Sequence, residues 1–146
     1  MESRIRSVPE TSSVRRVPAL IGAWVTLSVV YTIAGFSFGH LFANEGSASD
    51  PLVLPIVGFA ISNALLVLFF SWVADQMGHA VKAALTVAIS PLLLVNVDYV
   101  LGGSRGITAG IVSSIVLLVA WGSVGVVYQT LLMRGSSGAA DAQPII

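Results

Sequence analysis

Residues 107–133 read ITAGIVSSIVLLVAWGSVGVVYQTLLM, a stretch without a single Asp, Glu, Lys or Arg side chain. A helix needs roughly 20 apolar residues to cross the hydrocarbon layer of a membrane, which is about 30 Å thick. This stretch is long enough to do so, and it ends at Arg134, whose long side chain can reach the membrane surface. It therefore predicts a transmembrane helix over residues 107–133.

Three further apolar stretches meet the same length requirement, at residues 17–42, 51–74 and 80–101. Asp50 followed by Pro51 is a typical helix start, with Asp50 as the N-cap and Pro51 at the first helical position. Gly102 and Gly103 follow the third stretch, and glycine commonly ends a helix in the left-handed conformation. The sequence thus predicts an all-α integral membrane protein, a four-helix transmembrane bundle spanning residues 17–134.

The composition of the whole chain supports the same interpretation. Of its 146 residues, 55% are hydrophobic and 10% are charged, and the mean hydropathy is +0.91. Soluble domains are about 25% charged, so a soluble fold of this composition would expose large apolar patches. The net charge of zero offers no basic field for phosphates, so nucleic-acid binding is excluded. The expected partner is the lipid bilayer.

The distribution of Lys and Arg predicts the orientation of the bundle. Positively charged short segments stay on the cytoplasmic side of a membrane. Six of the seven Lys and Arg residues fall on one side of the predicted spans: Arg4, Arg6, Arg15, Arg16, Lys82 and Arg134. Only Arg105 falls on the other side. We therefore expect a multi-pass protein of the cell membrane with both termini in the cytoplasm.

The two ends of the chain, residues 1–16 and 135–146, are rich in Ser, Gly, Pro and Ala. Such segments cannot bury enough apolar surface to fold, so we expect two mobile cytoplasmic tails. The apolar run at residues 17–42 is longer than the core of a signal peptide, which has about 7–15 residues. We therefore expect this run to remain as the first span.

Small residues recur at helical spacing within the predicted spans. Gly35 and Gly39 form a small-xxx-small pattern, and residues 107–133 carry a face that contains Gly110, Ser114, Trp121 and Gly125. Such faces let helices approach closely in lipid. They favour packing within one bundle, or an interface in a homo-oligomer or a larger membrane complex. Pro91 near the middle of residues 80–101 predicts a kink or a local opening of that helix.

Four residues within the spans are candidates for lining a ligand site or a path: Asn63, Thr86, Ser90 and Trp121. Asn63 is strongly polar and lies near the centre of its span, where it either joins two helices or contacts a ligand. Thr86 and Ser90 share one helical face, and their hydroxyls either bond to their own helix or face a water-filled path.

Polar residues also gather toward the end of the bundle that is predicted to face outward. They are His40, Glu45, Asp50, Asn96, Asp98, Tyr99 and Arg105. One interpretation is a solvated rim, with Glu45, Asp50 and Arg105 as rim residues. The other is an acid–base site, in which His40 and Asp98 move protons on a hydrophobic substrate. Asn96 and Asp98 project about 200° apart on one helix, so they are not expected to face one pocket.

No metal or cofactor is expected. The chain has no cysteine, which removes cysteine-ligated zinc and iron–sulfur clusters. His40 and His79 lie at opposite ends of their predicted spans, about 30 Å apart across the hydrocarbon, so they cannot ligate one haem iron. No spacing of His, Asp and Glu supplies three or four convergent ligands.

Two functional hypotheses follow from these features. The first is a small polytopic membrane protein with a binding or transport-related role, acting as an oligomer or as a subunit of a membrane assembly. A hydrophobic small molecule is then an expected partner. The alternative is an intramembrane enzyme of the acid–base cyclase or isomerase type. It would act on an isoprenoid-like or polyketide-like substrate with His40 and Asp98.

Overall fold

A computed structural model describes residues 11–42 and 54–137, and these residues form helices with no strand among them. The elements are α1 (Thr11–Phe38), the 3₁₀ turn η1 (Gly39–Phe42), α2 (Pro55–Met77), α3 (Ala80–Pro91), the π-helix η2 (Leu92–Val97), α4 (Asp98–Leu101) and α5 (Ile107–Ser137). Within the described chain, four helical segments are long and apolar enough to cross a membrane: Arg16–Leu41, Pro55–Met77, Ala80–Leu101 and Ile107–Arg134. The predicted all-α fold with four such helices is confirmed.

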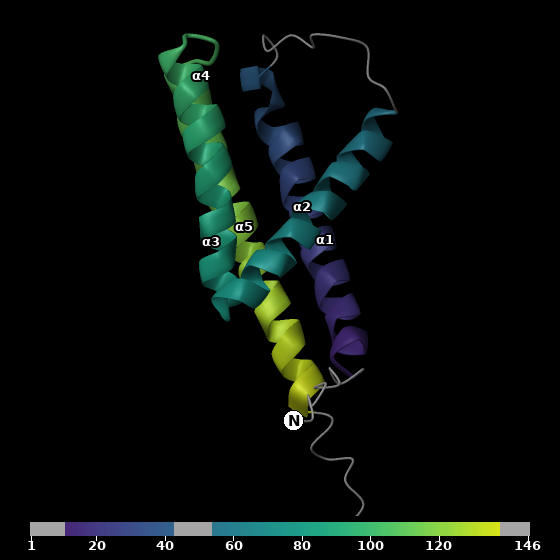
Figure 1. The fold of residues 1–146 in the computed structure, drawn as a ribbon. Helices are drawn as coiled ribbons and strands as arrows, with labels where there is room; N and C mark the ends of the chain where they lie inside the picture. The colour runs from purple at the N-terminus through teal and green to yellow at the C-terminus, as the bar shows by residue number, and fades with distance from the viewer. Residues whose placement is uncertain (1–10, 43–53, 138–146) are drawn as a thin grey trace, which may run out of the picture.

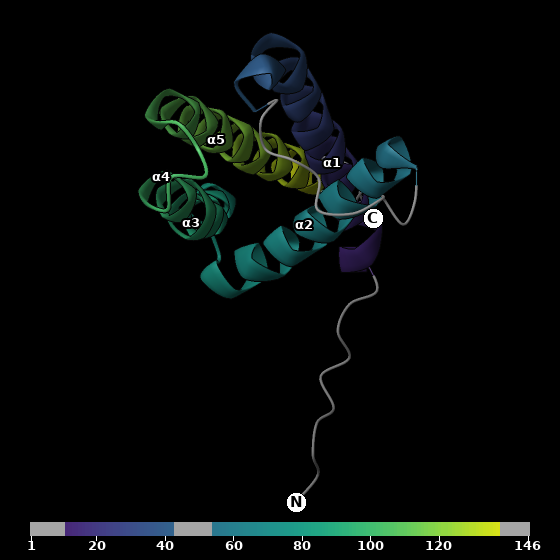
Figure 2. The ribbon, with the colours of Figure 1, turned by 90° about the horizontal axis from the view of Figure 1, so that it is seen from above.

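Helix α5 lies at the centre of the arrangement. Viewed from above, α1 runs along one side of α5, and α3 with α4 runs along the other (Figure 2). Helix α2 crosses the bundle obliquely and contacts both α3 and α1 (Figure 1). Asp75 and the connection from α2 to α3 mark one end of the bundle, called the Asp75 end. Arg105, in the connection from α4 to α5, marks the opposite Arg105 end.

The buried core lies mostly toward the Asp75 end. Its largest fully buried side chains are Leu27, Phe70, Trp121, Val124 and Tyr128, and alanines of α1 and α3 fill the space between them. The Phe70 ring of α2 lies 5.8 Å from the Trp121 ring and 5.2 Å from the Tyr128 ring, measured between centroids. Toward the Arg105 end, α1 diverges from α3 and α5 (Figure 1).

The closest approach of α3 and α5 depends on Gly125. A Cβ atom added at Gly125 would lie 2.9 Å from both Ala84 Cβ and Val81 Cα, closer than real Cβ contacts allow. The small-residue face predicted for residues 107–133 thus includes this packing position. In contrast, Cβ atoms at Gly35 and Gly39 would meet nothing within 4 Å, so this predicted packing motif contacts no other helix of the bundle there.

Several helix boundaries differ from the expected ones. Helix α1 begins at Thr11 rather than at 17, and α5 continues past 133 to Ser137. Helix α2 begins at Pro55 with Leu54 as its N-cap, and the predicted start at Asp50 and Pro51 lies outside the described residues. A helix that began at Pro51 would carry Pro55 in its interior, where the proline ring clashes with the preceding turn and no N–H is available. Pro55 is therefore the natural first residue.

The predicted span at residues 80–101 has the expected ends, but it is not a uniform α-helix. Pro91 ends α3, and the next six residues form the π-helix η2. The Leu92 N–H donates to both the Ala88 and Ile89 carbonyls, as expected where a proline has removed one donor from the ladder. The local opening predicted at Pro91 is thus present. Beyond α4, Gly103 adopts the left-handed conformation, with φ of 74°.

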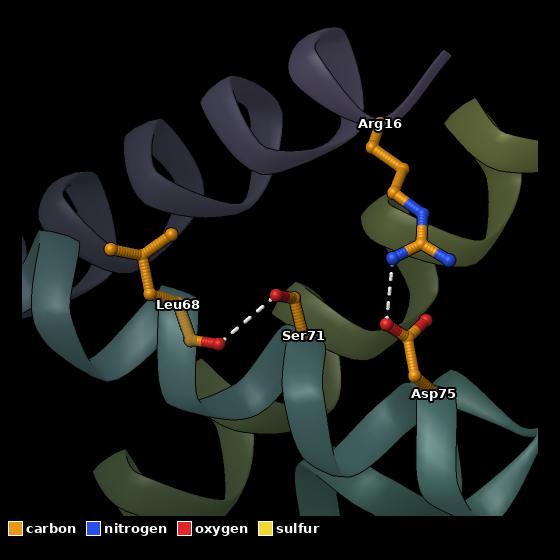
Figure 3. A network of polar contacts seen from close by, with 4 residues as sticks. All are labelled: Arg16, Leu68, Ser71 and Asp75. Carbon is orange, nitrogen blue, oxygen red and sulfur yellow. Dashed lines mark hydrogen bonds and ion pairs between the residues drawn. The ribbon is translucent and has the colours of Figure 1, made fainter. Parts of the chain in front are cut away.

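An ion pair joins α1 and α2 at the Asp75 end. Figure 3 shows the Arg16 guanidinium pointing toward the Asp75 carboxylate, and Nη1 lies 2.7 Å from Oδ2. Both side chains are exposed, so this pair adds at most about 1 kcal/mol to stability. One turn before Asp75, the Ser71 hydroxyl donates to the Leu68 carbonyl within α2 (Figure 3).

Candidate functional site

The candidate site is a group of four hydrogen-bonded residues at the Arg105 end, called the polar cluster: Asn96, Arg105, Ser113 and Ser114. Asn96 lies in η2 and is only 3% exposed. Its Nδ2 donates to Ser114 Oγ over 3.1 Å, and its Oδ1 accepts from Ser113 Oγ over 3.0 Å. A buried amide is costly unless it is hydrogen-bonded, so these serines of α5 stabilise the burial of Asn96.

Arg105 brings a positive charge to the polar cluster. Its Nη1 donates to Asn96 Oδ1 and, over 3.4 Å, to Ser113 Oγ. Its guanidinium carbon lies 5.4 Å from the centroid of the Tyr99 ring, a cation–π arrangement. The Arg105 backbone N–H also donates to the Tyr99 carbonyl, which fixes the connection between α4 and α5. The guanidinium is therefore held in place from several directions.

Three members of the polar cluster, Asn96, Arg105 and Ser113, form one wall of a cavity of about 310 Å³ between α1, η2 and α5. The rest of this wall is mainly apolar. The cavity is lined by Tyr31, Ala34, Gly35, Phe38, Pro91, Val95, Asn96, Arg105, Ser113, Val116 and Leu117. The α1 residues that line it belong to the C-terminal part of that helix, toward the Arg105 end. The space is thus apolar along most of its surface and polar at one end.

A second cavity of about 340 Å³ continues from the first toward the middle of the bundle. The two share Tyr31, Pro91, Val95 and Leu117, so they are adjacent, and we call the two together the groove. The second cavity is lined in addition by Leu66, Phe69, Val87, Ser90, Leu94 and Trp121. Phe69 and Leu94 are exposed, so the groove opens at the surface of the bundle. It runs from the polar cluster to Trp121.

Two of the residues expected to line a ligand site border the groove, and two do not. Ser90 and Trp121 line its inner part, where Trp121 is nearly fully buried. Asn63 is buried outside the groove, and its Nδ2 donates to Ser28 Oγ of α1 over 3.2 Å. The Thr86 hydroxyl donates to the Lys82 carbonyl of its own helix over 3.0 Å. The contact of Asn63 agrees with the interpretation that it joins two helices. The contact of Thr86 agrees with the interpretation that its hydroxyl bonds to its own helix.

The two candidate catalytic residues, His40 and Asp98, are both exposed near the Arg105 end. Neither lines the groove. The described contacts of Arg105 include Asn96, Ser113 and Tyr99, and among the described residues no ion pair joins Asp98 to Arg105. As expected from their angular separation, Asn96 is buried whereas Asp98 is exposed. Of the predicted rim, Glu45 and Asp50 lie outside the described residues.

The sequence analysis gave Asn96 no role apart from the rim, considered Ser114 only for packing, and did not consider Ser113. One signal could have singled out Asn96, because it interrupts the aliphatic run LLLVNV at 92–97. Its serine partners could not be inferred, because they depend on how η2 is rotated against α5. In the described part of the chain, no three His, Asp or Glu side chains are grouped as a metal site would need.

Comparison with known proteins gives no information about the site. No protein-family model, curated protein or solved structure matches this chain. In the described part of the chain, four helices are apolar enough to cross a membrane, and they enclose a groove that is polar at one end.

Proposed function

We propose that this chain is a small multi-pass membrane protein with a binding or transport-related role, and that its groove takes up a hydrophobic small molecule from the bilayer. The observation that carries the proposal is the polar cluster at one end of an otherwise apolar groove. Ligand sites are typically apolar cavities with a few convergent polar groups that orient the ligand. The groove volumes of about 310 and 340 Å³ fall in the range of such sites.

A groove-filling variant tests this proposal. Gly35 lines the groove, and a Cβ atom there meets nothing within 4 Å, so Gly35→Phe fills space without displacing the backbone. Gly39→Phe is the matched control, because Gly39 also has open space around its Cβ position but lines neither part of the groove. Reconstituted protein is labelled with a photoreactive alkyl probe, and the labelled peptides are identified by mass spectrometry.

We expect the probe to label groove residues of α3 and α5 in the wild type and in Gly39→Phe. Gly35→Phe should lose this labelling, while labelling of the exposed faces of α2 is unchanged. Labelling that is uniform around the helices, and equal in both variants, would mean that the groove holds only bulk lipid and would refute the proposal.

The enzyme alternative receives less support from the geometry. His40 and Asp98 are exposed and line neither part of the groove, so a ligand in the groove would not contact them. His40→Ala and Asp98→Asn should therefore leave probe labelling in the groove unchanged. Loss of labelling in both variants would favour the acid–base hypothesis over a binding role.

The proposed topology places both termini in the cytoplasm and the Arg105 end outside, in the cell membrane. It is supported by the excess of Lys and Arg on one side of the four apolar helices. The chain has no cysteine, so single cysteines can be introduced one at a time and labelled in intact cells with a membrane-impermeant maleimide. A cysteine at Ser104 should be labelled, and one at Ser136 should not. The opposite result would reverse the orientation.

Assembly into a homo-oligomer or a larger membrane complex is part of the same proposal. Helix α1 exposes the apolar side chains of Ile21, Val25 and Val29, which form a face where a second helix could approach. The size of the protein purified in mild detergent, measured by light scattering with correction for bound detergent, tests this. A strictly monomeric protein would remove the homo-oligomer.

A further inference from the structure

We propose that the ligand of the groove is a single-chain amphiphile with a carboxylate head, bound at Arg105, and with its tail directed toward Trp121. This inference rests on the binding function proposed above and names the class of its ligand.

The head group is assigned from the chemistry of the polar cluster. Arg105 lines the groove and always carries a positive charge, and its planar guanidinium matches the geometry of a carboxylate. The Asn96 and Ser113 oxygens orient this guanidinium before any ligand arrives, so little ordering is required on binding. The apolar walls lower the local dielectric, which strengthens attraction between opposite charges. A carboxylate fits this end of the groove.

The tail is assigned from the remainder of the groove. Between Ser113 and Trp121, α5 advances eight residues at 1.5 Å each, about 12 Å. That distance accommodates a single alkyl chain of medium length, and apart from the Ser90 and Tyr31 hydroxyls the lining along it is aliphatic or aromatic. The groove opens at Phe69 and Leu94, so the end of a longer chain can continue into the surrounding lipid.

The preference for one ligand over another must come from the head group. A tail gains little by leaving lipid for the groove, because lipid tails are as apolar as the groove walls. Contacts at the polar cluster are different, because an alkyl region of a membrane offers no hydrogen-bond donors. Hydrogen bonds to charged groups are also stronger than those between neutral groups. We therefore expect discrimination by head-group charge.

The test uses four amphiphiles of one chain length: dodecanoate, dodecanol, dodecylamine and dodecyl phosphate. Each competes with the photoreactive alkyl probe for the purified full-length protein in nanodiscs at pH 8. Wild type is compared with Arg105→Gln, which removes the charge, and with Arg105→Lys, which keeps it. Arg134→Gln is the control, because Arg134 is exposed at the other end of the bundle. Each amphiphile partitions into the bilayer to the same extent whichever protein variant is present. A difference in competition between variants therefore reports binding at the site.

We expect dodecanoate to compete at least about tenfold better than dodecanol in wild type and Arg134→Gln. The preference should disappear in Arg105→Gln while dodecanol still competes, and Arg105→Lys should retain part of it. Equal competition by dodecanoate and dodecanol in wild type would overturn the head-group assignment but leave the binding function standing. A preference for dodecylamine or for dodecyl phosphate would also overturn the carboxylate assignment. If no probe signal is sensitive to Gly35→Phe, the binding function fails as well.

Discussion

The tight contact between α3 and α5 gives the most direct test of the fold, through the substitution Gly125→Ala. The added Cβ atom would lie 2.9 Å from Ala84 Cβ and Val81 Cα, and 3.2 Å from the Ala80 carbonyl oxygen. Two of these three atoms belong to the backbone of α3, which cannot yield as the tip of a flexible side chain can. The helices must therefore separate locally, and overpacking of this kind costs about 1–3 kcal/mol.

Gly122→Ala is the matched control within the same helix. A Cβ atom at Gly122 meets nothing within 4 Å, so this substitution adds a methyl group without a clash. Both substitutions replace a helical glycine by alanine, and both gain the same intrinsic helix preference, roughly 0.5–1 kcal/mol. The difference between the two variants therefore measures the overpacking alone, and we expect it to be about 1–3 kcal/mol.

The assay is reversible unfolding in mixed micelles, in which the fraction of the denaturing detergent is increased and helix content is followed by circular dichroism. Gly125→Ala should unfold at a lower fraction of denaturing detergent than wild type, and Gly122→Ala at an equal or higher fraction. If both variants unfold together, the two helices are not in close contact at Gly125. The position of Trp121 in the core, which depends on that contact, would then also be in doubt.

Three further predictions concern single contacts. Asn63→Leu should lower the free energy of unfolding by about 0.6 kcal/mol, because the hydrogen bond to Ser28 is lost. Adding Ser28→Ala to this variant should lower the free energy of unfolding little further. If the effects of the two substitutions were fully additive, the two residues would not be hydrogen-bonded to each other. Asp75→Asn should change the free energy of unfolding by less than about 1 kcal/mol, and the effect should vanish at 1 M salt because its exposed partner Arg16 is then screened. Pro91→Ala restores a backbone hydrogen-bond donor, so we expect a straighter helix and a higher Tm. Probe labelling in the groove should become weaker. Unchanged labelling would show that the π-helix does not shape the groove.

Most of the fold follows from the distribution of charge along the sequence. The apolar stretches are long and clearly bounded, so the existence of four helices and the end of the third at Leu101 could be predicted. The start of α2 was predicted at Pro51 because Asp50 precedes it as a potential N-cap, although the second proline, Pro55, was already visible in the sequence. The choice between them depends on the clash that the later proline would cause inside a helix.

The site was less accessible to sequence reasoning, and the reason is η2. Projecting side chains around a helix assumes a constant rotation of 100° per residue, but a π-helix bonds i to i+5 and turns less per residue. Residues after Pro91 are therefore displaced from the faces that a uniform helix assigns to them. Asn96 lies in this segment, and its pairing with Ser113 and Ser114 depends on the displaced position.

The packing of α1 against α5 has a consequence for biosynthesis. Among the four apolar helices of this chain, α1 is synthesised before the others and α5 after them, yet these two pack against each other more extensively than any other pair of helices in the described residues. Until α5 is made, Gly22 of α1, which lies against Leu131 and Val127 of α5, has no permanent neighbour there and must contact lipid or the insertion machinery. A nascent chain halted before Ile107 should therefore remain sensitive to membrane proteases, and resistance should arise only when the final helix has been inserted.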